Sequence, residues 1–141
     1  LLDHHLPVDE RLIYACEDIS FEEGQTFARQ ILTDHPNCDA LFCVTDTVAM
    51  GAMVALKEAN RLIPHHLAVV GFSNWHMATI IEPPLTSVAQ PSQEMGQLAT
   101  ELLLQEIQAG KQEQPFHHQN IVLPTELIVR PSSQPLSRLT V

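Results

Sequence analysis

Residues 40–44 read ALFCV and are followed directly by Thr45 and Asp46. An unbroken apolar run of this length is typical of a strand that is buried on both faces of a parallel sheet. Two similar runs lie on either side of it, LIYAC at residues 12–16 and LAVVGF at residues 67–72. The runs recur at intervals of about 27 residues, the length of a β–α–β unit. The sequence therefore predicts an α/β domain with a doubly wound parallel sheet.

The segments between these runs carry helical signals. Ser20 and Glu23 have the spacing of a capping box, in which each side chain accepts a hydrogen bond from the backbone of the other residue. Asp46 is expected to cap a second helix. Apolar residues follow both caps at helical spacing: Gly24, Phe27, Ala28, Ile31 and Leu32 in the first helix, and Ala49, Ala52, Met53 and Leu56 in the second.

The pattern changes after Pro83 and Pro84, which break the chain. Residues 85–90 alternate like a strand, and a long helix is predicted from Ser92 to Gly110. The remaining predictions are a loop at 111–119, two short strands at 120–123 and 126–130, and a loose tail from residue 131. The inward side chains of the long helix are predicted to be Met95, Leu98, Ala99, Leu102, Leu103 and Ile107.

Composition limits the function. A chain of 141 residues with 45% hydrophobic residues suits one domain with a sizeable core. The formal net charge is −10 and the few Lys and Arg residues are scattered, which argues against a DNA-binding surface on this stretch. No apolar run approaches the roughly 20 residues of a membrane span, and no signal peptide is visible. Because the chain starts with Leu1, we expect a fragment of a longer protein.

Neither metal nor catalytic motifs stand out. Cys16, Cys38 and Cys43 form no C-x-x-C pair, so buried, reduced thiols are expected. The histidines occur as adjacent pairs in polar segments, where a solvated loop is the better interpretation than a zinc site. Nucleotide-binding and hydrolase motifs are lacking. We therefore predict no cofactor, no metal and no enzyme.

Polar residues follow each predicted strand, at 17–19, 45–47 and 73–75. Ligands of open α/β sheets bind at the carboxyl ends of strands, so these segments are candidates for a polar, hydroxyl-rich ligand. Asp46 and Ser73 have an alternative role as helix caps. Trp75 either stacks on a ligand ring or packs under a loop or at a subunit contact.

Four segments together resemble the LacI/GalR family of bacterial transcription regulators. They are DALFCVTDTVAMGA at 39–52, LAVVGFSN at 67–74, PPLTSVAQP at 83–91 and LPTELIVR at 123–130. The resemblance implies a two-lobed fold like that of periplasmic binding proteins. It assigns 1–90 to a C-terminal lobe whose start is truncated, 91–122 to a helix and strand of the N-terminal lobe, and 123–141 to a return strand and the tail.

The resemblance also implies the function and its residues. The parent would be a repressor-type regulator in the cytoplasm, with DNA bound by an N-terminal helix-turn-helix domain absent from this chain. This piece would bind a small effector, expected to be a sugar or related metabolite, and form a homodimer without any membrane contact. The implied ligand residues are Ile19, Thr45, Asp46, Ser73, Asn74 and Gln90, and the implied dimer residues are Met50, Met53, Ile80 and Ile81.

Rival interpretations remain at this stage. Core packing competes with the dimer role for Met53. A periplasmic sugar-binding protein of a transport system is the alternative to the regulator, and a helix-turn-helix pattern upstream would distinguish the two. An α/β enzyme is the third hypothesis, and the absence of turnover with candidate sugars would count against it.

Overall fold

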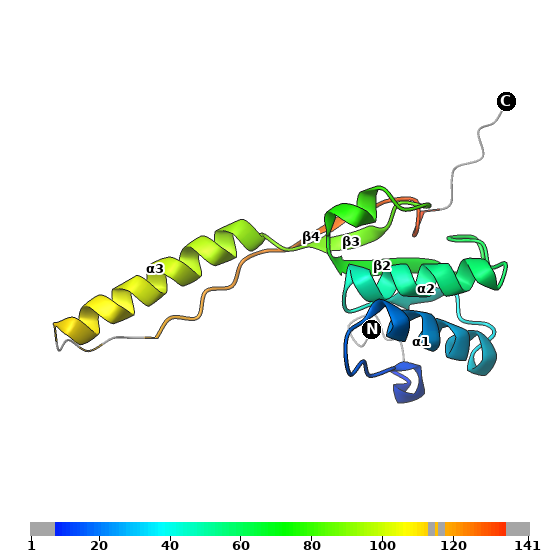
Figure 1. Cartoon of the computed structure of the whole chain (residues 1–141), viewed down its shortest axis with the longest axis horizontal. Helices are drawn as coiled ribbons and strands as arrows, with labels where there is room; N and C mark the ends of the chain where they lie inside the picture. Colours follow the sequence, from blue (N-terminus) through cyan, green and yellow to red (C-terminus); the bar gives the residue numbers. More distant parts are fainter. Residues whose placement is uncertain (1–7, 113–114, 116–117, 135–141) are drawn as a thin grey trace, which may run out of the picture.

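The computed structural model describes residues 8–112, 115 and 118–134 (Figure 1). Its sheet has four strands in the order β1-β2-β3-β4, namely Ala40–Phe42, Ala68–Ser73, Thr86–Ala89 and Glu126–Ile128. The first three strands pair in parallel, whereas β3 and β4 pair antiparallel. The α/β class with a mostly parallel sheet is therefore confirmed.

Two helices form the core together with this sheet. They are α1 (Phe21–Asp34), which packs along α2, and α2 (Asp46–Glu58), which packs on the sheet. The predicted capping box of Ser20 and Glu23 starts α1. Gly24 lets the helices approach closely, because a Cβ there would overlap the backbone carbonyl of Val48. The core joins α2 to the sheet through buried residues that include Met53, Leu56, Leu67, Val69 and Leu85.

The first predicted strand is not formed. The chain instead makes the short 3-10 helix η2 (Glu10–Leu12), and residues 13–16 have no strand pairing. Tyr14 packs against Phe27 of α1 with ring centroids 5.6 Å apart. A strand requires a hydrogen-bonded neighbour, and within the described residues β1 pairs only with β2. Tyr14 of this run therefore packs on α1 and Cys16 packs against the core, whereas Leu12 and Ile13 are exposed.

The long helix α3 (Ser92–Lys111) has the predicted extent but not the predicted burial. No residue of α3 is buried, and Met95, Leu103 and Ile107 are exposed. Figure 1 shows why: α3 extends away from the sheet, and the chain then runs back beside it to β4. The prediction of an inward stripe is wrong for this chain, because the described residues include no element that packs against that face.

Two predictions near the C-terminus also need correction. Residues 120–123 form no strand, and only Glu126–Ile128 pairs with the sheet. Residues 131–134, predicted as a loose tail, are anchored to the sheet by Ser132, which is fully buried. Its Oγ accepts a hydrogen bond from Thr86 N at 2.8 Å and donates one to Val69 O at 2.6 Å. The rest of the predicted tail lies outside the described residues, and the division into lobes stays a prediction.

A second 3-10 helix in the described residues, η3 (His76–Thr79), connects β2 to the segment before β3. Its Ala78 is fully buried in the core. None of the helices in the described part of the chain has the length and hydropathy to span a membrane.

Candidate ligand-binding site

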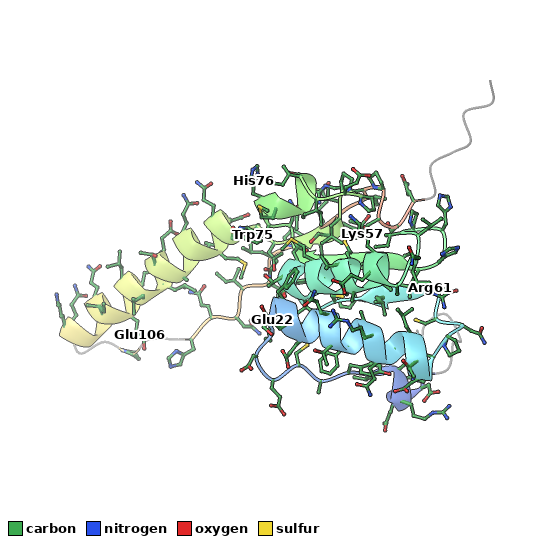
Figure 2. The ribbon with its side chains drawn as sticks, turned by 45° about the vertical axis from the view of Figure 1, so that its right-hand side comes forward. Glu22, Lys57, Arg61, Trp75, His76 and Glu106 are labelled. Atoms are coloured by element: carbon green, nitrogen blue, oxygen red, sulfur yellow. The ribbon has the colours of Figure 1, made fainter. Side chains whose placement is uncertain are left out.

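The parallel strands bring the predicted ligand segments to one edge of the sheet. Thr45 follows β1, Ser73 ends β2, and Gln90 follows β3, whose Ala89 is the register partner of Ser73. Because α1 packs along the first half of α2, its N-terminal segment with Ile19 lies toward the same end. Figure 2 places Glu22, at the start of α1, and Trp75 on the side of the sheet from which α3 extends.

A buried carboxylate supports this edge from beneath. Asp46 is 1% exposed, and its two oxygens accept hydrogen bonds from Ser87 Oγ and from the backbone N–H of Trp75, both at 2.6 Å. Gly71 leaves room for it, since a Cβ there would overlap Asp46 Oδ1. Both oxygens are therefore committed inside the protein. Asp46 holds the loop after β2 in place, and its role toward a ligand stays a prediction.

The N-cap of α2 is Thr45 and not Asp46. Thr45 Oγ1 accepts a hydrogen bond from Val48 N at 3.3 Å, while Asp46 is already the first helical residue. The predicted capping role of Asp46 is thus wrong by one position. Thr45 is half-buried, and its hydroxyl already holds the first turn of α2.

Left-handed backbone conformations gather at this edge. Among the described residues, four non-glycine residues have a positive φ, and three of them are Ile19 at 50°, Ser73 at 112° and Asn74 at 52°. A β-branched residue such as Ile19 rarely adopts this conformation. Such strain persists only where the surroundings hold it in place, and it concentrates at functional sites.

Glu23 holds the segment that carries Ile19. Its carboxylate accepts hydrogen bonds from the backbone N–H groups of Glu17 at 2.7 Å and Asp18 at 3.0 Å, in addition to that of Ser20. These donors, that of Glu17 first, hold the pKa of Glu23 below its ordinary value. The capping residue predicted from the sequence therefore also orders the turn that precedes α1.

Arg130 holds the segment that carries Asn74. Its Nη2 donates to Asn74 Oδ1 and its Nη1 donates to Leu85 O, both at 2.6 Å. The backbone N–H of Asn74 donates to Ser87 Oγ at 2.9 Å. Neither Arg130 nor Ser87 was identified as a site residue from the sequence. No local pattern links them to residues that are distant along the chain.

The side chains left to meet a ligand are mixed in character. Ser73 and Gln90 are exposed hydroxyl and amide groups, and Ile19 and Trp75 are about half exposed, at 49% and 53%. Asn74 is half-buried, with its oxygen already bonded to Arg130. The edge thus combines hydrogen-bonding groups with an apolar side chain and one indole ring.

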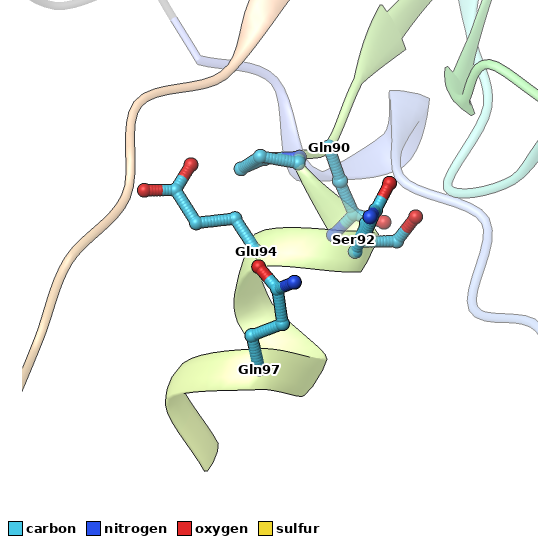
Figure 3. Close-up of a pocket in the computed structure, with 6 residues that line it drawn as sticks. Gln90, Ser92, Glu94 and Gln97 are labelled. Carbon is cyan, nitrogen blue, oxygen red and sulfur yellow. The ribbon is translucent and has the colours of Figure 1, made fainter. Parts of the chain in front are cut away.

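A shallow polar depression continues the site along the start of α3 (Figure 3). Its lining comes from one continuous segment: Gln90, Pro91, Ser92, Gln93, Glu94 and Gln97. Because only one segment forms it, the depression is open on the side that faces away from α3. It extends the polar surface around Gln90 and encloses no ligand by itself.

The four predicted dimer residues do not share one exposed patch. Met53 is 3% exposed and belongs to the hydrophobic core, in agreement with the alternative reading. Met50 and Ile81 are half-buried, and Ile81 packs against the core. Ile80 is exposed. A partner surface made from this set would therefore rest on Ile80 and Met50.

Within the described residues, no group of three or more His, Cys, Asp and Glu side chains is placed to hold a metal ion. The burial of Cys43 raises its thiol pKa to about 12, which keeps it protonated at neutral pH. Burial also raises the pKa of Cys16.

Comparison with known proteins places the fold. A family model described as a periplasmic binding protein-like domain matches residues 3–133. The ribose operon repressor of Halalkalibacterium halodurans is 33% identical over 86% of this chain and 36% of its own length. The transcriptional regulator CelR of Thermobifida fusca is 34% identical over 94% of this chain and 37% of its own length. This chain thus spans little more than a third of these curated relatives.

Solved structures of two regulators are also similar to this chain. The complex of the transcriptional regulator CelR with cellobiose superposes with a TM-score of 0.85 at 31% identity, over 94% of this chain and 39% of that one. A LacI family regulator from Enterococcus faecium with bound ribose gives 0.70 at 31% identity, over 84% and 42%. These relatives are regulators and not enzymes.

Proposed function

Because the chain belongs to the periplasmic-binding-protein-like effector domains of the LacI family of transcription regulators, we propose that it binds a small sugar or related metabolite for a DNA-binding repressor. The observation that carries the proposal is the gathering of Thr45, Ser73 and Gln90 at the carboxyl ends of parallel strands. Binding at that edge is the rule for open α/β sheets.

The chemistry of the edge favours a ligand rich in hydroxyl groups. The Ser73 hydroxyl and the Gln90 amide each donate and accept hydrogen bonds, as sugar hydroxyls do. Trp75 offers an indole face that is half exposed, and Ile19 offers an apolar surface. The relatives whose names mention ribose or whose structure contains cellobiose support a sugar as the ligand class.

The proposed mechanism is a population shift. Gln90 stands where the chain leaves the sheet for α3, and β4 brings the chain back beside β3. A ligand that contacts both the loop after β2 and the start of α3 favours one arrangement of the two parts. It moves the equilibrium only by the difference in its affinity for the two arrangements.

The wider role follows from the family and is proposed with it. DNA would be bound by a helix-turn-helix part outside this chain, since the net charge of −10 suits no DNA surface here. Homodimerisation would use Ile80 and Met50, and the protein would act in the cytoplasm. A periplasmic sugar-binding receptor is the rival, and the regulators among the relatives count against it.

A thermal-shift screen tests the proposal, with ribose, cellobiose, nucleosides and purines as probes. A ligand that binds only the folded state raises the melting temperature by mass action. We expect a shift with one class of probe, and loss of that shift in Ser73→Ala and Gln90→Ala. Thr33→Ala is the control, because Thr33 lies in the last turn of α1, at the opposite end from the capping box. A cooperative melt that no probe shifts contradicts the proposal.

A further inference from the structure

Arg130 connects two parts of the molecule that lie far apart in sequence. It follows β4, the strand by which the chain returns to the sheet after α3. Its guanidinium group donates to Leu85 O, just before β3, and to Asn74 Oδ1, in the loop after β2. Its own backbone N–H donates to Thr86 Oγ1 at 2.8 Å. Both ends of the residue are thus fixed.

The loop that Arg130 reaches is in a conformation that needs support. Ser73 and Asn74 both have a positive φ. The backbone N–H groups of Asn74 and Trp75 are held by Ser87 and Asp46, whereas the side chain of Asn74 is held by Arg130. A charge-assisted bond from a planar guanidinium that also binds a second acceptor is stronger and more directional than a neutral contact.

We infer that Arg130 is a positioning residue that couples the returning strand β4 to the ligand loop at residues 73–75. The coupling to a ligand rests on the proposed function; the coupling of the strand to the loop does not. A displacement of β4 that disturbs the contacts of Arg130 with Leu85 and Thr86 also shifts the guanidinium group. It therefore weakens or strengthens the hydrogen bond to Asn74 and changes how Ser73 is presented. The conformation of the loop at residues 73–75 therefore depends on the position of α3 and of the chain that returns from it to β4.

Amide hydrogen exchange at Asn74 and Trp75, followed by NMR, tests the coupling without any ligand. We expect Arg130→Lys to raise both exchange rates about tenfold, because an ammonium group cannot hold the two acceptors in the same planar geometry. Asn74→Gly should do the same while it preserves the left-handed backbone. Asn74→Asp should retain protection, since its carboxylate still accepts from Arg130. Arg29→Gln is the control, because it removes an arginine from an exposed ion pair with Glu58.

The double variant Arg130→Lys, Asn74→Gly decides whether the two residues act as one unit. We expect its exchange rates to match those of each single variant, since removing either partner already removes the contact. The inference is overturned if the exchange-rate increase in the double variant equals the product of the two single-variant increases. It is also overturned if the exchange rates are unchanged in Arg130→Lys. Arg130→Lys keeps the positive charge of the side chain. A melting temperature equal to that of the unsubstituted protein would show that faster exchange comes from local loosening and not from general destabilisation.

The two proposals fail in different ways. If no sugar shifts the melting temperature while Arg130→Lys still accelerates loop exchange, the proposed ligand class is wrong and the coupling stands. If a sugar binds and its affinity is the same in Arg130→Lys as in the unsubstituted protein, the link from Arg130 to the ligand is wrong. We expect about a tenfold loss of sugar affinity in Arg130→Lys and none in Arg29→Gln.

Discussion

The hydroxyl of Ser87 in β3 donates a hydrogen bond of 2.6 Å to the carboxylate of Asp46, at the first residue of α2. Both side chains are almost completely buried. The same carboxylate accepts the backbone N–H of Trp75. One buried acceptor therefore ties the helix, the central sheet and the loop after β2 into a single unit.

Removal of this carboxylate should destabilise the fold. We expect Asp46→Ala to lower the free energy of unfolding by about 3 kcal/mol, because the buried Ser87 hydroxyl and the part-buried Trp75 N–H lose a charged acceptor. Asp46→Asn should cost less, since its amide oxygen still accepts one of the two bonds. Urea unfolding measures both, with the exposed Asp39→Asn as a control. Equal stability of Asp46→Ala and the unsubstituted protein would show that the contact contributes nothing.

Acid should loosen the turn before α1 through Glu23. Its folded pKa is lowered from the ordinary value of 4.5, so its contribution to stability is present above that value and is lost as the pH falls through the folded pKa. We expect the melting temperature to fall more steeply between about pH 5 and 3 in the unsubstituted protein than in Glu23→Gln. Glu22→Gln removes the neighbouring carboxylate in the first turn of α1 and should leave the steep fall of the melting temperature unchanged. Identical slopes for all three proteins would count against the role of Glu23.

Cys43 should resist alkylation in the folded protein. Because its pKa is raised to about 12, almost none of it is thiolate at neutral pH, and burial blocks access. We expect iodoacetamide to modify Cys43 at least about a hundredfold more slowly in the native protein than in urea. Peptide mass spectrometry at timed intervals gives the rates for each cysteine. Rapid native labelling of Cys43 would mean that the core opens around it.

Ser132 should anchor the segment after β4. Its hydroxyl accepts from Thr86 and donates to Val69, both within the sheet. We expect Ser132→Ala to cost about 2 kcal/mol of unfolding free energy, because it leaves a buried N–H and a buried carbonyl without a side-chain partner. Denaturant unfolding measures the loss, and the exposed Thr33→Ala provides the comparison. A loss of unfolding free energy no greater than that of Thr33→Ala would show that Ser132 does not anchor the segment.

The exposed side of α3 should make this 141-residue chain self-associate. Leu103, Leu104 and Ile107 are each about half exposed, and Val122 on the returning segment is 85% exposed. We expect Leu103→Gln combined with Ile107→Gln to lower light scattering at high concentration, because it breaks up an apolar surface. Val54→Gln, a single exposed apolar residue on α2, is the matched control. If both variants scatter alike, α3 is not the surface responsible.

Local signals accounted for the elements that form from their own sequence. The capping box at Ser20 starts α1, the apolar run at 40–44 contains β1, the run at 67–72 covers β2 except for its last residue, and Ser92 starts α3. Each of these depends on spacing, capping or β-branched content within a few residues. The run at 12–16 is also apolar but forms no strand, because a strand requires a hydrogen-bonded neighbour as well, which composition does not supply.

The sequence by itself determined the fold class and the edge of the sheet where the predicted ligand residues gather, since parallel strands align their carboxyl ends and the polar residues follow directly in the chain. Only the tertiary structure decided what each of those residues does. Asp46 faces Ser87 and Trp75, and Asn74 faces Arg130, across separations of 29 to 56 residues. Contacts over such distances depend on how strands and helices pack, and no local pattern encodes them.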